Sequence, residues 1–399
     1  MGVSDRLDFV FSLARQQREA DEALVSEQRA VREVEGSSAR RWLLAKKTEK
    51  MGSSAFGFLR GSMQFFSSAL SAVRGSVRDA AERGWIVGDA HAENFGALRS
   101  DRGTPWEPGE VRFWINDFDA VQRGLYVDDV LRLCTSAVLA GSTREHRAER
   151  TIAWIEAALD GYLSAKIVEP SPSIERLLKK VRHRSYADFL RSRTETVATP
   201  KLPMHRFIRG ARYAELERKV QRSIEPIALA IDEHDEVFAA QRYDAFRVDD
   251  MAFRIAGNGS LGVLRVAIAI KPEQPEDPPW LYDLKAMSAT REAMQEGRAA
   301  LGAVDRAPGI VSVGESSMLL RPLAPQEDKL AMEKVPTEEF EPLFRYLGSI
   351  LGAAHYGLKS SKRPRWKKEL RRAIVQATVA LASLHFAGFV AYASADDAR

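Results

Sequence analysis

The stretch GDAHAENFG, at Gly88–Gly96, contains the residues whose types and spacing are best suited to chemistry. Asp89 precedes Asn94 by five positions, and His91 lies between them. In phosphoryl transfer from a nucleotide, one carboxylate orients or deprotonates the acceptor hydroxyl, while an asparagine helps to hold Mg²⁺ against the phosphates. The spacing therefore predicts that Asp89 is catalytic and that Asn94 is a metal ligand. His91 is expected to support the loop by hydrogen bonding rather than to transfer protons.

A second acidic stretch, WINDFD at Trp114–Asp119, supplies the rest of this chemistry. Asp117 and Asp119 end a run in which apolar residues alternate as in a β-strand: Val111, Phe113 and Ile115. An aspartate at the tip of a strand, some tens of residues after the first motif, suits a Mg²⁺ ligand. We therefore predict Asp117 as the main metal ligand and Asp119 as a second one. Isolated aspartates usually lie in turns or caps, but the apolar residues before both motifs favour the chemical interpretation.

Glycines form a third candidate element within FRIAGNGSLGVLRVAIAI. Their G-x-G-x-x-G spacing alone is a weak signal, and a dinucleotide site would need a helix directly after it. Here β-branched residues follow, which predicts a strand. Glycines between two strands form the flap that covers nucleotide phosphates in kinases. The predicted flap contains Gly257, Gly259, Ser260 and Gly262.

The stretch WLYDLKAM predicts a second strand that carries Lys285. Alternation places this lysine on the face opposite to Trp280, Tyr282 and Leu284. A helix capped by Ser288 or Thr290 is expected next, with Glu292 and Glu296 on one face. Single lysines on strands are normally surface residues. The order of flap, hairpin, lysine and glutamates instead predicts that Lys285 binds the phosphates, held by one of the two glutamates.

Both acidic motifs resemble those of a known group of enzymes. GDAHAENFG is similar to the catalytic loop G-D-x-H-x-x-N of aminoglycoside phosphotransferases and choline kinases, and NDFD is similar to their metal-binding motif. With FGFLRGS at Phe56–Ser62, the pattern most closely resembles a bacterial family of unknown function placed among kinase-like folds. The resemblance implies that Asp89 is the catalytic base, that Asn94 and Asp117 are metal ligands, and that Asp129 braces the catalytic loop.

The chain departs from the pattern of this group at two positions. Val87 stands where such phosphotransferases often have His, and Asp119 stands where protein kinases have the Gly of D-F-G. Neither change removes a catalytic group. Both leave room for an altered acceptor or reaction.

The order of the motifs predicts a circular permutation. In kinases the flap and lysine precede the catalytic loop, whereas here they follow it by roughly 160 residues. GIVSVGESSMLLRPLAP resembles the last strands of the nucleotide-covering lobe, running into a hinge at Arg321–Leu323, so Arg321 is expected near the nucleotide. PLFRYLGSILGAAHYGL resembles the helix that leads into the catalytic loop of unpermuted relatives. We therefore expect an α+β, protein-kinase-like fold with a helical lobe and a smaller antiparallel-sheet lobe.

Four segments follow from this arrangement. Residues 1–87 are expected to form an N-terminal helical segment, and 88–245 the catalytic helical lobe. Residues 246–325 would form the nucleotide-covering β lobe, and 326–399 the C-terminal helices that pack on the catalytic lobe. The acceptor pocket is expected within 165–245, where Arg182, His183, Arg184 and Arg206 either gather an acidic acceptor or form exposed helix faces.

Composition limits the classes of partner. The chain has 399 residues, 45% hydrophobic and 29% charged, with a net charge of +4, which fits a soluble globular protein rather than a generally nucleic-acid-binding one. Cys134 is the only cysteine, so intrachain disulfides and cysteine-rich zinc sites are excluded. No uninterrupted apolar run approaches the roughly 18 residues of a membrane span, and no signal peptide is evident. We expect a cytoplasmic protein with no membrane partner. The sequence does not indicate the oligomeric state.

These features predict an ATP- and Mg²⁺-dependent phosphotransferase acting on an unknown hydroxyl acceptor, a small molecule in preference to a protein. Two alternatives stay open: a nucleotide-binding pseudokinase or sensor, and a kinase-fold enzyme that transfers AMP. A zinc deaminase based on His91 and Glu93 is excluded because its cysteine pair is absent. Nucleic-acid binding by the basic stretch around Trp366 is disfavoured because stacking aromatics are not interleaved along it.

Overall fold

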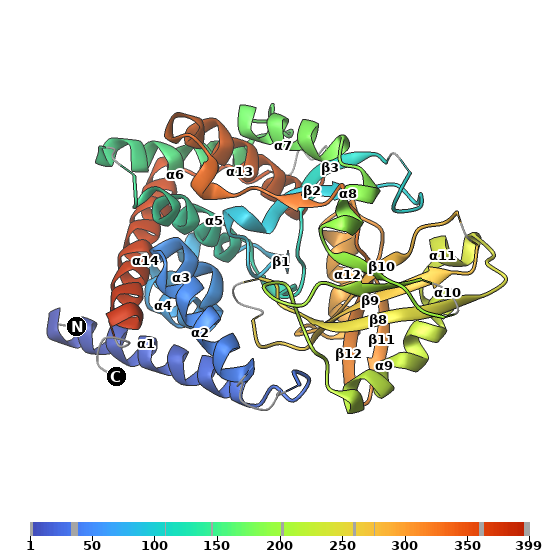
Figure 1. The fold of residues 1–399 in the computed structure, drawn as a ribbon. Coiled ribbons are helices and arrows are strands. Elements are labelled where there is room, and N and C mark those ends of the chain that lie inside the picture. The colour runs from blue at the N-terminus through green and yellow to red at the C-terminus, as the bar shows by residue number, and fades with distance from the viewer. Residues whose placement is uncertain are drawn as a thin grey trace.

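The computed structural model describes residues 3–32, 39–107, 109–144, 147–200, 203–257, 261–274, 276–358 and 363–394 (Figure 1). Helices gather on one side of the molecule, and a six-stranded antiparallel sheet lies on the other (Figure 1). The predicted α+β architecture with a helical part and a sheet part is therefore confirmed. We call these two parts the helical lobe and the sheet lobe.

The helical lobe forms around one large apolar core, because its helices carry apolar residues at helical spacing. Helix α5 lies at the centre and is buried on nearly all sides; its buried residues are mostly apolar but include Asp129 and Arg132. The helices of this lobe are α1 (Val3–Ser26), α2 (Ala39–Gly52), α3 (Ala55–Gly61), α4 (Met63–Val73), α5 (Tyr126–Gly141), α6 (Ala148–Leu163), α7 (Pro172–Arg182), α13 (Phe340–Tyr356) and α14 (Lys368–Ser394), with the 3₁₀ turn η1 (Arg74–Ala80).

The sheet lobe is built from strands in the order β11-β12-β10-β9-β8-β7, each antiparallel to its neighbour. Their bounds are β7 (Tyr213–Ala214), β8 (Phe246–Arg254), β9 (Arg265–Pro272), β10 (Trp280–Ala286), β11 (Gly309–Val313) and β12 (Ser316–Pro322). On one face the sheet packs against α9 (Arg218–Leu229), α10 (Ile231–His234) and α11 (Glu236–Ala240). As predicted, Trp280, Tyr282 and Leu284 point into this core, and Lys285 points to the other side.

A second small core covers part of the opposite face of the sheet. Phe207 and Tyr213 pack there on the small residues Ala252, Ala267 and Ala269. Phe207 ends β6 (Met204–Phe207), which pairs with β5 (Thr194–Val197), and Tyr213 lies on β7. Phe189 of α8 (Tyr186–Arg191) packs against the same core.

Short strands between the lobes carry the acidic motifs. The pair β1 (Arg83–Ile86) and β4 (Gln122–Leu125) and the sheet β13-β2-β3 lie on the helical lobe, facing the large sheet (Figure 1). In the latter, β2 (Phe95–Arg99) and β3 (Val111–Ile115) form the expected hairpin, and β13 (Asp328–Lys329) joins its edge. Helix α12 (Arg291–Ala300) follows β10 and packs on β1 and β4. It therefore links the two lobes.

The boundary between the two apolar cores does not coincide with the boundaries of the four predicted segments. Val25, Val31 and Leu43, from the N-terminal segment, belong to the core of the sheet lobe, as do residues of α9–α11 before position 245. Sequence periodicity predicted these helices but not their partners. The N-terminal segment therefore contacts both lobes.

The close crossing of α6 and α13 depends on two glycines. A Cβ at Gly348 would collide with the carbonyl of Ala158, and one at Gly161 with the carbonyl of Arg345. We expect Gly348→Ala to lower the free energy of unfolding by about 1–3 kcal/mol, because the helices must separate. Urea denaturation would measure the change. Gly52→Ala, at the end of α2 with no atom near the added methyl, is the matched control and should not destabilise.

One helix contradicts a sequence expectation. By length and composition α14 could cross a membrane, whereas we expected no such segment. The Gln, Thr and His residues within this helix interrupt the apolar run, so the sequence did not show an uninterrupted apolar stretch of the required length. In the structure α14 packs along α1, α4 and α5 and buries residues such as Leu381 and His385 in the core of the helical lobe. Only its outer face is exposed, at Val379, Phe386 and Val390. Its apolar residues thus serve the core on one side and form an exposed face on the other, with 39% of its most apolar stretch buried.

Candidate active site

The loop after β1 makes a tight turn that only glycine accommodates. Gly88 has φ +81°, and a Cβ there would collide with the carbonyl of Ala120. The turn is completed by the main-chain bonds from His91 to Asp89 (2.9 Å) and from Asn94 to His91 (2.8 Å). The loop is joined to the second acidic motif by the bond from the Asn116 amide to the Asn94 carbonyl (2.9 Å). The two motifs are therefore held as one unit.

Asp129, which the resemblance implied as a brace, lies beneath this loop. Its carboxylate accepts hydrogen bonds from the amides of Val87 (2.7 Å) and Gly88 (2.9 Å) and contacts Nε2 of His355 (3.1 Å). Tyr162 contacts the other ring nitrogen of His355 (2.9 Å). All these groups are buried, so the turn of the catalytic loop rests on a polar network inside an apolar core.

Asp89 projects from the loop into a cavity, and Arg132 holds it from behind. The guanidinium of Arg132, fully buried, donates to Oδ1 of Asp89 from Nε (2.9 Å) and Nη2 (2.7 Å), and also to the carbonyl of Leu59 (2.8 Å). Burial raises the pKa of Asp89 above its usual value, and Arg132 opposes that rise. Oδ2 is left on the side of His91, whose Nε2 lies 3.7 Å away. One oxygen is thus fixed, and the other is available to an acceptor.

His91 is a neutral, buried residue of the same cavity. Burial first, and then the positive charges of Arg60 and Arg132, hold the pKa of His91 well below its usual value. Its ring lies edge-on to Phe56, and its Nδ1 is buried without a hydrogen-bond partner. Within the described residues, the ring therefore makes none of the hydrogen bonds by which the sequence predicted it to support the loop, and one polar atom is left for a ligand.

Asn94 is oriented by two carbonyls. Its Nδ2 donates to the main-chain oxygens of Asp89 (3.0 Å) and Asp117 (3.1 Å). Because the nitrogen is engaged, Oδ1 is the atom left for a cation. With the carboxylates of Asp117 and Asp119 this makes a set of oxygen donors suited to Mg²⁺. Within the described residues, no cluster of three or more His, Cys, Asp and Glu side chains could hold a metal, so an Mg²⁺ here depends on Asn94 and on phosphate or water oxygens.

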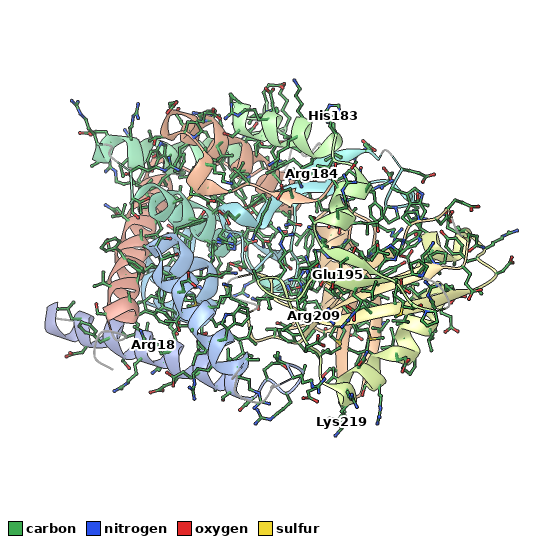
Figure 2. The ribbon with its side chains drawn as sticks, viewed as in Figure 1. Arg18, His183, Arg184, Glu195, Arg209 and Lys219 are labelled. Atoms are coloured by element: carbon green, nitrogen blue, oxygen red, sulfur yellow. The ribbon has the colours of Figure 1, made fainter. Side chains whose placement is uncertain are left out.

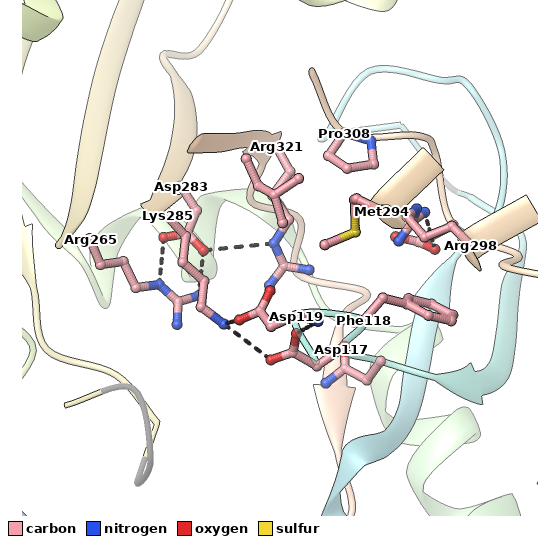
Figure 3. Close-up of a pocket in the computed structure, with 13 residues that line it drawn as sticks. Asp117, Phe118, Asp119, Arg265, Asp283, Lys285, Met294, Arg298, Pro308 and Arg321 are labelled. Atoms are coloured by element: carbon pink, nitrogen blue, oxygen red, sulfur yellow. Dashed lines mark hydrogen bonds and ion pairs between the residues drawn. The ribbon is translucent and has the colours of Figure 1, made fainter. Parts of the chain in front are cut away.

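Lys285 joins the two carboxylates (Figure 3). Its Nζ lies 3.2 Å from Oδ2 of Asp117 and also pairs with Asp119. Burial opposes ionisation of Asp117, but Lys285 and then Arg321 outweigh it, so the pKa of Asp117 lies below its usual value. The lysine thus occupies the place next to the acids that the sequence predicted.

The predicted partners of Lys285 are wrong in this structure. Glu292 and Glu296 are exposed on α12, and neither pairs with the lysine. The helix is capped by Thr290, one of the two predicted caps. It buries Met294 and Gly297, and Gly297 packs so closely on Val121 that a Cβ there would collide. The face of α12 that carries the glutamates therefore points to solvent.

Arg321 belongs to a second ionic group beside Lys285. Asp283, two residues before the lysine, is buried and contacts Arg254 (2.7 Å), Arg265 (2.8 Å) and, at 3.7 Å, Arg321. Although burial opposes it, these guanidinium groups hold the pKa of Asp283 far below its usual value. Figure 3 shows Arg321 directed between Asp283 and the acidic motif. Asp283 was not predicted, since alternation indicated only that it shares the face of Lys285.

The glycine loop between β8 and β9 lies against the N-terminal helices. Gly257 (φ +80°) and Gly262 (φ +100°) mark its two sides, whereas the predicted flap residues Gly259 and Ser260 lie outside the described residues. Three side chains donate to carbonyls of the loop: Gln28 to Gly262 (2.6 Å), Lys47 to Leu261 (3.2 Å) and Lys50 to Gly257 (3.3 Å). Lys47 is itself buried and paired with Asp21 (3.4 Å). Hydrogen bonds from the N-terminal segment therefore fix the described part of the loop in place.

These elements enclose a cavity of about 270 Å³. The catalytic loop and the second acidic motif form its floor, and Gly257, Val263 and Lys285 form its roof. The remaining walls come from the start of the chain, at Arg60 and Met63, and from Lys329 after the last strand of the large sheet. Chain segments separated by more than half of the sequence thus meet at one site.

The family models give one match. The family described as "Uncharacterized protein conserved in bacteria (DUF2252)" matches residues 41–169 and 164–395. The chain belongs to this family. Its matched ranges contain both acidic motifs, Lys285 and Lys329, and so nearly every wall of the cavity. No curated protein and no solved structure gives a significant match.

Two charged residues of this family member's site escaped the sequence analysis: Arg132, which binds Asp89 from behind, and Lys329, which lines the cavity. Arg132 follows Asp129 by three positions, so both lie on one helical face, and that spacing could have revealed it. Lys329 has no local signal, because only the pairing of β13 with β2 brings it to the cavity.

The expected acceptor segment 165–245 does not line the cavity. Arg184 pairs with Asp328, and Figure 2 shows His183 at the outer edge of the helical lobe. Arg209 lies over the sheet, where it pairs with Asp250 (2.8 Å), and Lys219 projects from the far edge of the sheet lobe (Figure 2). The wall expected from this segment is supplied instead by α3 and by the start of α4.

Proposed function

We propose that this protein is an ATP- and Mg²⁺-dependent phosphotransferase with a circularly permuted, kinase-like fold, acting in the cytoplasm on the hydroxyl of a small molecule. The observation that carries the proposal is the convergence of Asp89, Asn94, Asp117 and Lys285 on one cavity beneath a glycine loop. These are the residue types that phosphoryl transfer needs, in positions that match their roles.

Each side chain has a distinct task in this reaction. Asp89, with one oxygen fixed by Arg132, orients the acceptor hydroxyl and accepts its proton as the oxygen attacks the γ-phosphorus. Asn94, Asp117 and Asp119 would hold Mg²⁺, which when bound neutralises charge on the phosphates. Lys285, which pairs with the two aspartates, would then pair with the phosphates, and ADP leaves. The glycine loop and the N-terminal helices exclude water.

Two features of the fold support the permutation. Helices α1 and α14 lie side by side: Arg18 donates to the carbonyl of Tyr392 (3.0 Å), and the Tyr392 hydroxyl donates to Asp21 (3.0 Å). Permutation is tolerated where the ends of a chain are adjacent at a surface. The order of β8, the glycine loop, β9, β10 and α12 also follows the order in the nucleotide-covering lobe of kinases.

One observation favours a second candidate, a nucleotide sensor without turnover. Arg132 binds Asp89 through two nitrogens and opposes the rise in the pKa of Asp89 that burial causes, so Asp89 also forms a buried ion pair that needs no turnover. Product analysis separates the possibilities: ADP indicates phosphoryl transfer, pyrophosphate indicates AMP transfer, and binding without either product indicates a sensor.

The decisive experiment is a thermal-shift titration with Mg²⁺ and nucleotides. At a ligand concentration of 100 times Kd, we expect Mg²⁺–ATP to stabilise the wild type by about 2.7 kcal/mol. Asp117→Ala should lose this stabilisation, because a ligand of the metal and the partner of Lys285 disappear together. Asp232→Ala, an exposed carboxylate on α10, serves as the control. If neither ATP nor GTP stabilises the wild type, the proposed function is wrong.

A further inference from the structure

The positive charges around the cavity fall into two groups. One group, Lys285, Arg265 and Arg321, surrounds Asp117, and these are the cations that lower its pKa. Each of them is paired with a carboxylate of the sheet lobe or of the second acidic motif. This group lies where the donor phosphates would bind, and its charges are already largely balanced by carboxylates.

The second group lies on the other side, around Glu93 and His91. It consists of Arg60 on α3, Lys329 on β13 and, behind them, Lys50 on α2, whose charges act on one another. Glu93 is the carboxylate that pairs with Arg60, through Oε2 (2.8 Å), and its Oε1 accepts from the amide of Met332 (2.9 Å), while Glu49 acts on Lys50. In the described part of the chain, Lys329 has no carboxylate within ion-pair distance. This side therefore carries net positive charge.

His91 adds an unused polar atom on this side. The residue lines the cavity, is only 7% exposed, and its Nδ1 lacks a partner. A buried polar atom without a partner is unfavourable by about 1–3 kcal/mol. A ligand that hydrogen-bonds to it would remove this cost. Arg60 and Lys329, distant in sequence, thus present cationic donors to one space beside Asp89 that His91 also lines.

We propose that this basic group is a subsite for an oxyanion carried by the acceptor. The acceptor would then be a small hydroxy compound with a carboxylate or phosphate group, whose oxyanion binds Arg60 and Lys329 while its hydroxyl faces Asp89. The inference rests on the proposed function and specifies its substrate class. Residues Gly257 and Val263 beside the glycine loop, together with Arg60 and Gly61 of α3, line the cavity, whose volume of about 270 Å³ suits a small acceptor.

The test uses inorganic phosphate as the probe, with the donor site already filled. Wild-type protein is saturated with Mg²⁺ and a non-hydrolysable ATP analogue, and phosphate binding is then measured by calorimetry. We expect phosphate to bind, and Lys329→Gln to weaken that binding at least fivefold while the affinity for the nucleotide analogue changes less than twofold. Lys334→Gln, an exposed lysine five positions further on, is the matched control and should behave as wild type.

Glycerol, glycerate and glycerol phosphate form the second arm, because they differ only in the charged group. Binding of both anions but not of glycerol supports the subsite, and the stronger anion identifies its preference. The inference is overturned if phosphate fails to bind the filled protein, if Lys329→Gln binds it as well as wild type, or if Lys329→Gln weakens phosphate and nucleotide equally. If the nucleotide analogue itself does not bind, the proposed function fails instead.

The pH dependence of phosphate binding provides a further measurement. A purely structural role of Lys329 would not change this pH dependence. Desolvation in the cleft, and then Arg60, lower the pKa of Lys329 to about 8, while Glu93 and Asp117 oppose this and Lys50 adds to it. The lysine is charged below that pH, so affinity should hold there and decline as the pH rises through about 8. Lys329→Arg should retain binding at higher pH, because a guanidinium stays protonated. An unchanged profile in Lys329→Arg contradicts the assignment.

Discussion

Asp89→Asn is expected to lower the rate of ADP release by about 10²–10⁴-fold, the usual contribution of a positioned general base. The change keeps the size of the side chain but removes the oxygen that would accept the proton. Because Asp89 is not expected to bind the metal, the affinity for Mg²⁺–ATP should stay within about twofold of wild type. Intrinsic hydrolysis, in which water replaces the acceptor, allows the measurement before the acceptor is identified.

Two comparisons make this result specific. Asp79→Asn, at an exposed site in η1, controls for loss of charge and should leave hydrolysis unchanged. Arg132→Gln tests the group behind Asp89 and should also reduce turnover, since Asp89 would lose both charge-assisted bonds. Full turnover by Asp89→Asn would show that the carboxylate serves only to pair with Arg132.

Asp129→Asn should produce the largest loss of stability. The carboxylate receives two main-chain amides and His355 in the core, and an asparagine amide cannot accept all three bonds. Breaking a buried charged network by removing one partner typically lowers the free energy of unfolding by about 3–5 kcal/mol. Urea denaturation measures this change, and hydrolysis should fall as well, because the turn at Gly88 loses its support.

The neighbouring residue provides the control for Asp129. Asp128 pairs with the half-exposed Arg74 at the surface of the helical lobe (2.7 Å), and a pair of this kind contributes roughly 0–1 kcal/mol. Asp128→Asn should therefore change stability little. Equal effects of the two substitutions would mean that the catalytic loop does not depend on Asp129.

Local sequence patterns predicted the local structure of the site well. The alternation in VRFWI and WLYDLKAM indicates strands buried on one or both faces. As expected, the first strand, β3, ends shortly before Asp117, and the second, β10, carries Lys285. The glycines were predictable for the same reason, since Gly88, Gly257 and Gly262 adopt backbone angles that other residues avoid. Such patterns depend only on neighbours within a few residues.

The sequence did not predict which residues contact one another between distant elements of the fold. Glu292 and Glu296 have the right spacing to support Lys285, but α12 turns its small residue Gly297 inward against Val121, and this packing decides which face is buried. Lys329 reaches the cavity only because β13 pairs with β2. The acceptor-side wall comes from α3 rather than from 165–245, because the N-terminal helices pack on both lobes. Each of these outcomes depends on contacts across the whole fold.

The anchoring of the glycine loop by Gln28 and Lys47 has a consequence for how the protein is made. During synthesis Gln28 and Lys47 leave the ribosome first, the two acidic motifs follow, and the glycine loop emerges much later. A growing chain therefore carries the acidic motifs before the glycine loop that covers them has been made. A chain released before α13 would lack the core residues that α13 and α14 supply, among them Leu347, Leu351 and Leu381, and the apolar residues that they cover would be exposed. Under the proposed function, turnover is therefore expected only after the glycine loop and α13 have been synthesised.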